Sequence, residues 1–275
     1  MMASQNPRLK VTKIEKCSQP KAPGALRLLC FSDTHEKHLK IPPHQIVPCD
    51  ICICAGDFTK FGDPAEVKKF KDWFIKIPAR YRVLIAGNHE TTFDVERYGR
   101  MVTQMRKIKS DLPRETAKSI VQTDGIIYLE NESVEIEGLK IYGSPQTHYW
   151  EFWAFYYPDK DGPKVWAKIP HDTDILVCHT CPRSTIDLMR GQHVGCKSLA
   201  NAIKEVQPSL VIYGHLHEGY GVAKIGKSVI ANVSLTNLAR KLANRPMIFD
   251  VSFKTPEIPR PLPKQPEETE IPKDE

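Results

Sequence analysis

Eight side chains that can bind metals or move protons follow short apolar segments in this 275-residue chain. They are Asp33, His35, Asp57, Asn88, His89, His179, His215 and His217. One such residue at a strand end is commonly a cap or a turn residue, but five successive segments that end this way predict a shared site. Carboxylate, amide and imidazole ligands without cysteine favour Mn, Fe, Co or Zn, and eight groups exceed what one ion needs. The sequence therefore predicts two divalent ions.

The segments that must position these groups have the length and composition of buried strands. They span residues 25–31, 51–55, 81–86, 174–178 and 209–213. Amphipathic helices are predicted over 63–77, 95–108 and 195–206. In the first of them Asp63 is the expected N-cap and Glu66 is expected to complete a capping box. This alternation is typical of layered α/β proteins, whose ligands gather beyond the carboxyl ends of the strands.

Other parts of the chain alternate apolar and polar residues and predict antiparallel pairing. Residues 126–129 and 134–142, around Glu137-Gly138, predict a hairpin that begins a second sheet or an antiparallel edge. A second hairpin is expected over 221–233, and a last strand over 247–253.

Three regions are predicted from composition. Residues 1–24 form a leader in which 11–14 are open to a frayed or an edge-strand interpretation, residues 25–253 form one domain, and residues 254–275 form a disordered tail. The tail is rich in Pro, Glu and Lys, and its polyproline-type segment Pro259–Pro263 predicts an SH3-type partner.

Charge and hydropathy exclude several classes of protein. The chain is 41% hydrophobic and 26% charged, which suits one large core. Its net charge of +6 arises from interspersed acidic and basic residues, so we expect no dedicated nucleic-acid surface, although the charge suits an anionic substrate. No apolar run of membrane-spanning length and no apolar signal segment occurs, so we expect no membrane partner and a cytoplasmic location.

Two further patterns have alternative interpretations. Cys49-x-x-Cys52 and Cys178-x-x-Cys181 could together form a zinc site, but their apolar neighbours favour reduced, buried thiols. The aromatic segment 149–157 could form a rim on which a nucleobase stacks, but we favour its packing into the core.

The order of the polar motifs resembles the calcineurin-like metallophosphoesterase superfamily, with its D-x-H, G-D, G-N-H-[DE], lone His and G-H-x-H signature. Here the motifs stand as Asp33-Thr34-His35, Gly56-Asp57, Gly87-Asn88-His89-Glu90, His179 and Gly214-His215-Leu216-His217. The segments His193-Val194-Gly195-Cys196 and Glu218-Gly219-Tyr220-Gly221 narrow the resemblance to the metallophosphoesterase-domain-containing, class III phosphodiesterase-like family. The resemblance implies an α/β-β/α sandwich of two mostly mixed sheets flanked by helices, with the dimetal site at strand carboxyl ends.

The resemblance also implies a role for each residue. Asp33, His35 and His217 would bind one ion, Asn88, His179 and His215 would bind the other, and Asp57 would bridge them. His89 would be the general acid, oriented by Asp33 or Glu90. The preferred metal is manganese, with iron, zinc or cobalt as alternatives. The implied activity is hydrolysis of small phosphodiesters, such as 2′,3′- or 3′,5′-cyclic nucleotides, by a hydroxide that bridges the two ions.

Two other activities compete with this one. Protein serine/threonine phosphatases share Gly-Asn-His-Glu, but they use G-D-x-x-D-R-G and an arginine before that motif to hold a phosphomonoester. This chain has Lys60-Phe61-Gly62 and Ala86 at those places. A scaffold that has lost activity would lack ligands, whereas every ligand position is kept here. The nearby Lys37, His38, Lys60 and Arg183 receive no site role.

Overall fold

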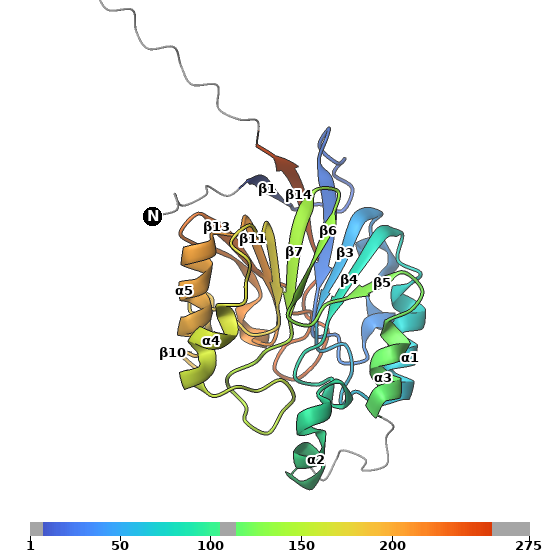
Figure 1. Ribbon diagram of the computed structural model, residues 1–275. Coiled ribbons are helices and arrows are strands. Elements are labelled where there is room, and N and C mark those ends of the chain that lie inside the picture. The colour runs from blue at the N-terminus through green and yellow to red at the C-terminus, as the bar shows by residue number, and fades with distance from the viewer. Residues whose placement is uncertain (1–7, 105–113, 255–275) are drawn as a thin grey trace, which may run out of the picture.

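Two six-stranded mixed sheets pack face to face between helices in the computed structural model of the chain, which describes residues 8–104 and 114–254 (Figure 1). In order across the first sheet, the strands are β1 (Leu9–Ile14), β14 (Met247–Phe253), β2 (Leu26–Phe31), β3 (Cys49–Ala55), β4 (Ala79–Ile85) and β5 (Ile126–Tyr128). In order across the second, they are β12 (Gly221–Ile225), β13 (Ser228–Asn232), β11 (Leu210–Tyr213), β8 (Ile175–Cys178), β7 (Leu139–Ser144) and β6 (Glu132–Ile136). The predicted α/β-β/α sandwich is confirmed.

Helices cover the outer face of each sheet (Figure 1). The helices are α1 (Pro64–Phe74), α2 (Val95–Gln104), α3 (Arg114–Val121), α4 (Gly162–Trp166) and α5 (Lys197–Val206). Short 3-10 turns η1–η5 lie at His38–Lys40, Pro43–Gln45, Thr91–Phe93, Asp159–Asp161 and His217–Gly219, and a small hairpin joins β9 (Leu188–Met189) to β10 (Gln192–His193). α1 and α3 pack on the first sheet, and α4 and α5 pack on the second.

The core has three apolar layers that follow from the strand pattern. Every second residue of the central strands, such as Ile51 and Ile53 of β3 and Ile212 of β11, lies between the sheets. The alternate residues face the helices: Cys52 packs with Phe70 of α1. Because both faces of the central strands are buried, β8 and β11 are apolar throughout and the carboxyl halves of β2, β3 and β4 are apolar, as expected for parallel strands covered on both sides.

The five predicted strands are all present, and their carboxyl ends meet at one edge of the sandwich. β2, β3 and β4 are parallel neighbours in one sheet, and β8 and β11 are parallel neighbours in the other. A parallel bridge between Ser32 and Ser234 connects the ends of the two sheets. The loops that follow the five strands are thereby brought together.

The N-terminal segment contributes to the first sheet. Leu9–Ile14 pairs antiparallel with β14 as an edge strand, which is one of the two interpretations the sequence left open. The sheet therefore begins ahead of residue 25. The predicted tail, with its Pro259–Pro263 segment, and the end of the helix predicted over 95–108 lie outside the described residues.

Three local predictions need correction. Residues 126–128 do not belong to the hairpin, because β5 pairs in parallel with β4 at the edge of the first sheet. The hairpin consists of β6 and β7, and its turn has positive φ at both Glu137 and Gly138. Helix α1 ends at Phe74, and its Glu66 accepts hydrogen bonds from the amides of Lys60 and Phe61 instead of completing a capping box.

The cysteines do not form the alternative zinc site. Cys52 is buried between the first sheet and its helices, whereas Cys178 and Cys181 are buried on the helix side of the second sheet. All eight cysteines are free.

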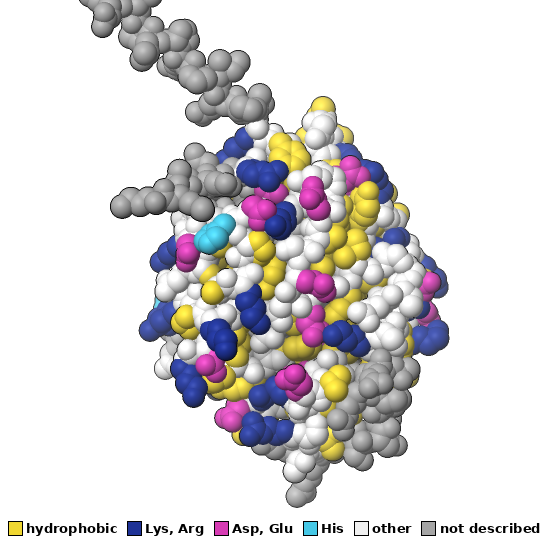
Figure 2. Space-filling model, in the orientation of Figure 1, with side chains coloured by type: hydrophobic (Ala, Val, Ile, Leu, Met, Phe, Trp, Pro, Cys, Tyr) yellow, Lys and Arg dark blue, Asp and Glu magenta, His cyan; other side chains and the backbone are white. Residues whose placement is uncertain are grey.

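Within residues 8–104 and 114–254, no helix combines the length and the apolar character that crossing a membrane requires. On the face seen in Figure 2, basic and acidic side chains are interspersed.

Candidate metal centre

The predicted site residues lie together where the five loops meet. Three groups of side chains there have ligand atoms within 4.8 Å of one another: Asp33 with His35 and His217, His35 with Asp57 and His89, and Asp57 with His179 and His215. Asn88 completes the last group, because its Oδ1 lies 2.8 Å from His215 Nδ1 and 3.2 Å from His179 Nε2. All eight residues named from the sequence are thus neighbours, although they span 185 positions from 33 to 217.

The first group directs two imidazole nitrogens at one point. The Nε2 atoms of His35 and His217 are 3.2 Å apart, and His217 Nε2 is 3.3 Å from Asp33 Oδ1. Both rings have Nδ1 close to a backbone carbonyl, that of Thr59 for His35 and that of Asn237 for His217. A proton on each Nδ1 leaves both Nε2 atoms as lone-pair donors that face each other.

The second group has the same character. His179 donates from Nδ1 to the carbonyl of Ala55 at 2.8 Å, which directs its Nε2 at Asp57 Oδ1, 3.2 Å away. Oδ1 of Asn88 faces Nδ1 of His215. With these imidazoles neutral, their free nitrogens and the oxygens of Asp57 and Asn88 converge as electron-pair donors, so both groups fit a divalent metal ion.

Asp57 lies between the two groups. Its Oδ1 is 3.2 Å from His179 Nε2, and its Oδ2 is 3.9 Å from both His35 Nε2 and His89 Nε2. One carboxylate therefore presents an oxygen to each group, which is the geometry that a bridging ligand requires.

Burial and mutual charge shift the titration of these residues. Burial and the charge of His89 lower the pKa of His35 to about 3. Burial alone would lower the pKa of His179, but the Asp57 carboxylate outweighs it and raises that pKa to about 9. Burial also raises the pKa of Asp57, yet the charges of the surrounding imidazoles lower it well below its usual value. The carboxylate thus stays ionised and the metal must displace protons from imidazole.

His89 differs from the other residues of these groups in what its second ring nitrogen faces. Its Nδ1 lies 2.6 Å from the carbonyl of Lys60, and its Nε2 faces the cavity, 3.2 Å from Nη2 of Arg240. Its ring packs against Trp153 with centroids 4.1 Å apart. The sequence had led us to expect that Asp33 or Glu90 orients His89. The carbonyl of Lys60 does so instead.

Glu90 instead connects the loop after β4 to the loop after β3. Its carboxylate accepts hydrogen bonds from the amides of Asp57, Thr59 and Gly87 and from the hydroxyl of Thr59. Burial and the charge of Asp57 raise the pKa of Glu90 to about 8, whereas the four donated hydrogen bonds favour the ionised form. The loops after β3 and β4 are thereby held in one arrangement.

Two glycines permit the close approach of these loops. A Cβ at Gly87 would lie 2.3 Å from Oδ1 of Asp57, and a Cβ at Gly214 would lie 2.2 Å from Oδ2 of Asp33. Any side chain at either position would occupy the space of a predicted ligand.

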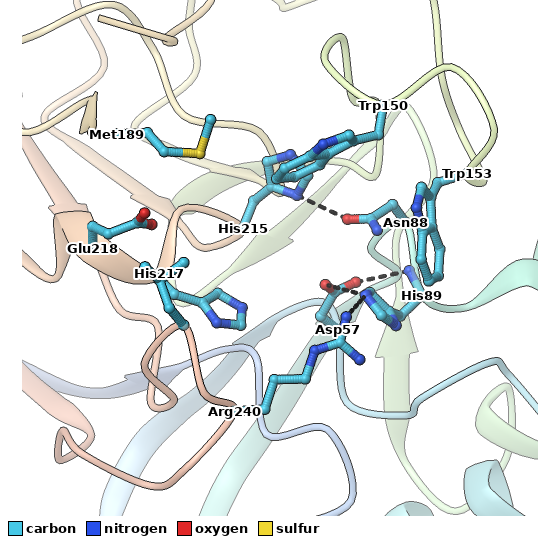
Figure 3. Close-up of a pocket in the computed structure, with 11 residues that line it drawn as sticks. Asp57, Asn88, His89, Trp150, Trp153, Met189, His215, His217, Glu218 and Arg240 are labelled. Carbon is cyan, nitrogen blue, oxygen red and sulfur yellow. Dashed lines mark hydrogen bonds and ion pairs between the residues drawn. The ribbon is translucent and has the colours of Figure 1, made fainter. Parts of the chain in front are cut away.

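A cavity of about 320 Å³ opens onto these groups of candidate metal ligands (Figure 3). Besides predicted site residues, it is lined by Trp150, Trp153, Met189, Glu218, Leu238 and Arg240. Sequence reasoning gave Arg240 and Leu238 no role, because their loop, between β13 and β14, has no motif and no periodicity.

The aromatic segment proved to have two parts. Phe155 and Tyr157 are buried, as the core interpretation predicted. Trp150 and Trp153 instead line the cavity, where Trp150 packs against His215 with ring centroids 4.7 Å apart. For these two tryptophans, the rim interpretation that we had not favoured describes their place.

The remaining basic residues near the motifs lie outside the cavity lining. Lys60 pairs with Glu36, and Arg183 is exposed and donates to the carbonyl of His193. His38 is buried against Phe70, and burial lowers its pKa to about 4.

Comparison with known proteins agrees with this geometry. The sequence model of the family described as calcineurin-like phosphoesterase matches residues 26–219. The metallophosphoesterase domain-containing protein 1 of Homo sapiens and that of Mus musculus are each 37% identical over 243 residues, which cover 84% of this chain and 73% of theirs. A similar fold occurs in the crystal structure of TT1561 of Thermus thermophilus, with a TM-score of 0.51, 17% identity, and coverage of 80% of this chain and 97% of that chain. This chain therefore belongs to the calcineurin-like phosphoesterase family and is a phosphoester hydrolase with a candidate metal-binding cluster of histidine and aspartate.

Proposed function

We propose that this protein is a dinuclear metal-dependent phosphodiesterase that hydrolyses small diesters, cyclic nucleotides in particular. The observation that carries the proposal is the meeting of three groups of candidate ligands, two of which share Asp57, at one end of a cavity of about 320 Å³. A cavity of this size suits a small molecule.

Two bound cations would supply an activated water and hold the phosphate oxygens. Asp33, His35 and His217 would hold one ion, Asn88, His179 and His215 the other, and Asp57 both. His89 would act on the leaving group, because its Nε2 faces the cavity while its Nδ1 is held by the Lys60 carbonyl. A proton on that Nε2, gained once Arg240 no longer donates to it, would pass to the departing oxygen.

The cavity walls support a nucleotide as the substrate. Trp150 is 39% exposed although its ring lies beside His215, and Trp153 packs against both Phe61 and His89. The indole rings beside the candidate metal ligands could stack on a nucleobase, an interaction that contributes about 1–3 kcal/mol per base.

Manganese is the metal we propose, with iron, zinc or cobalt as alternatives, because the ligands are oxygens and imidazole nitrogens. Eight free thiols support a reducing compartment, the cytoplasm, as its location.

Hydrolysis of bis(p-nitrophenyl) phosphate and of p-nitrophenyl phosphate tests the activity, with purified protein loaded with Mn²⁺, Fe²⁺, Zn²⁺ or Co²⁺. We expect the diester to have the higher kcat/KM, and 2′,3′- or 3′,5′-cyclic nucleotides to compete with it. The His215→Ala variant is the negative control. Preference for the monoester would instead indicate a phosphatase, and silence with every metal would indicate a scaffold.

A further inference from the structure

Arg240 lies over the candidate metal centre in a position that none of the site motifs explains. Its guanidinium lines the cavity, and its Nη2 is 3.2 Å from Nε2 of His89 (Figure 3). We propose that Arg240 binds a non-bridging oxygen of the substrate phosphate, opposite the metal ions, and so belongs to the substrate site. The inference deepens the proposed function and rests on it.

The first argument is the charge of the guanidinium and its surroundings. Among the side chains that the structure describes, no carboxylate forms an ion pair with Arg240; the contact at the tip of its guanidinium is a ring nitrogen of His89. A guanidinium carries five N–H donors in a planar fork that matches two phosphate oxygens. Apart from the N–H directed at His89, its donors are therefore available to an anion in the cavity.

The second argument is the construction of the loop that carries it. The amide of Arg240 donates to the carbonyl of Asn237 at 2.7 Å, and Oδ1 of Asn237 accepts from the amide of Lys241 at 3.1 Å. The same Asn237 carbonyl lies 2.9 Å from Nδ1 of the predicted metal ligand His217. One turn thus connects the position of Arg240 to that of a ligand.

The backbone of Arg240 is also unusual. Its φ is +51°, a left-handed conformation that a side chain with a Cβ rarely adopts. Such conformations persist where the surrounding contacts enforce them, and they are frequent at ligand sites. Here the two hydrogen bonds to Asn237 enforce it, and the result directs the side chain toward His89.

A third argument is the positive potential at this side of the cavity. Lys37 and Lys60 lie in neighbouring loops but outside the lining of the cavity. Lys60 is paired with Glu36, which leaves Arg240 as the lining cation of the cavity. An anion in the cavity would be attracted to the positive charge of Arg240.

The assignment resolves a difference noted in the sequence. Protein phosphatases carry an arginine before Gly-Asn-His-Glu, and this chain has Ala86 there. Arg240 would supply a guanidinium from a loop 151 positions after His89.

Titration calorimetry of inorganic phosphate into the full, Mn²⁺-loaded chain tests the proposal without requiring turnover. Arg240→Met removes the charge and keeps the length, Arg240→Lys keeps the charge without the fork, and Lys241→Met removes a neighbouring charge that does not line the cavity. We expect Arg240→Met to weaken phosphate binding about 10- to 100-fold, the effect of losing one charge-assisted hydrogen bond. Arg240→Lys should recover part of this loss, and Lys241→Met should bind as the unmodified chain does.

Metal content and thermal unfolding of each variant separate substrate binding from a structural role of the loop. The expected result is unchanged metal content in both Arg240 variants. Phosphate binding by Arg240→Met equal to that of the unmodified chain, an equal loss in Lys241→Met, or loss of metal that accounts for the weaker binding would each overturn the proposal. Phosphate binding that depends on Arg240 in a protein without diesterase activity would retain this assignment and reject the proposed function.

Discussion

At the scale of single residues, this site depends on which atoms carry protons. Hydrogen bonds from Nδ1 to backbone carbonyls leave Nε2 of His35, His179 and His217 directed at neighbouring acceptors. His89 is fixed in the same way by Lys60, but its free nitrogen faces the cavity and Arg240. A histidine side chain at this site is thus suited to metal binding or to proton transfer according to what its second ring nitrogen faces.

His89→Ala should separate these two roles. We expect kcat for a diester to fall about 10²- to 10⁴-fold, the usual contribution of a general acid, while bound metal and the unfolding temperature remain those of the unmodified chain. Kinetics with elemental analysis of the same preparations gives the result. If the variant loses its metal instead, His89 is a ligand and the division of roles is wrong.

Asp57→Asn should weaken both metal sites together, because the carboxylate presents one oxygen to each ligand group. We expect metal affinity to fall at least about 10- to 100-fold, the range seen when only an outer partner of a ligand is removed. Dialysis against graded chelator concentrations measures this. Asp187→Asn is the matched control, since Asp187 is also buried but pairs with His193 away from the centre. Two ions held as tightly in Asp57→Asn would contradict the bridge.

At the scale of elements, the centre is made by turns placed after parallel strands. The strands bring five loops to one edge, and Glu90 ties the loop after β4 to the loop after β3 through three hydrogen bonds. The close approach of these loops also requires glycine at position 87, because a Cβ there would lie 2.3 Å from Oδ1 of Asp57 and 2.6 Å from Cε1 of His179.

Gly87→Ala should therefore lower metal content while leaving most of the fold intact. The added Cβ must displace Asp57 or His179, and a displacement of about 1 Å exceeds the tolerance of a metal site. Gly99→Ala is the control, since nothing lies within 4 Å of a Cβ at this helical position. That variant should keep its metal and be as stable as the unmodified chain or more so. Equal metal content in the two variants would show that the loops can separate freely.

At the scale of the whole molecule, a buried ion pair joins β2 to the last strand. Arg27 and Asp250 pair through two contacts of 2.8 and 2.9 Å, and both are more than 90% buried. Asp250 also accepts from the amide of Ala22, so three segments of the chain meet at this carboxylate.

This pair should make the protein sensitive to acid. Burial raises the pKa of Asp250, but its hydrogen bonds with Arg27 lower that pKa by more than burial raises it. The pKa in the folded state therefore lies below the unfolded value of about 3.9. A carboxylate with a lowered pKa stabilises the fold above its unfolded pKa, and this stability is lost as pH falls through the folded pKa. Urea unfolding between about pH 7 and pH 2 should show a loss that is smaller in Asp250→Asn.

Asp250→Asn should also destabilise the protein at neutral pH by about 3–5 kcal/mol, because it leaves the Arg27 charge buried without a partner. Asp72→Asn provides the control: Asp72 pairs with Lys68 on the exposed face of α1, and its removal should leave the unfolding free energy nearly unchanged. Similar losses in the two variants would mean that burial of the Arg27 pair has no energetic consequence.

Much of the architecture could be predicted because it is encoded locally. An apolar run followed by Gly-Asp or by Gly-Asn-His specifies a buried strand and the turn after it within ten residues, and the hairpin at Glu137-Gly138 is equally local. Glu66 shows the limit of local rules, since a capping-box sequence formed a different pair of hydrogen bonds once the loop before it was folded. β5 shows the same limit of local rules, because an alternating pattern over three residues does not determine which sheet they join.

By itself, then, the sequence determined the kinds of ligand, their order and the strands that carry them, because side-chain chemistry and short-range periodicity survive without a fold. Only the tertiary structure decided which other side chains share the cavity. Arg240 meets His89, and Trp150 meets His215, because two separate sheets pack with their strand ends at one edge. Contacts of that kind arise from packing between distant segments, and no spacing within either segment specifies them.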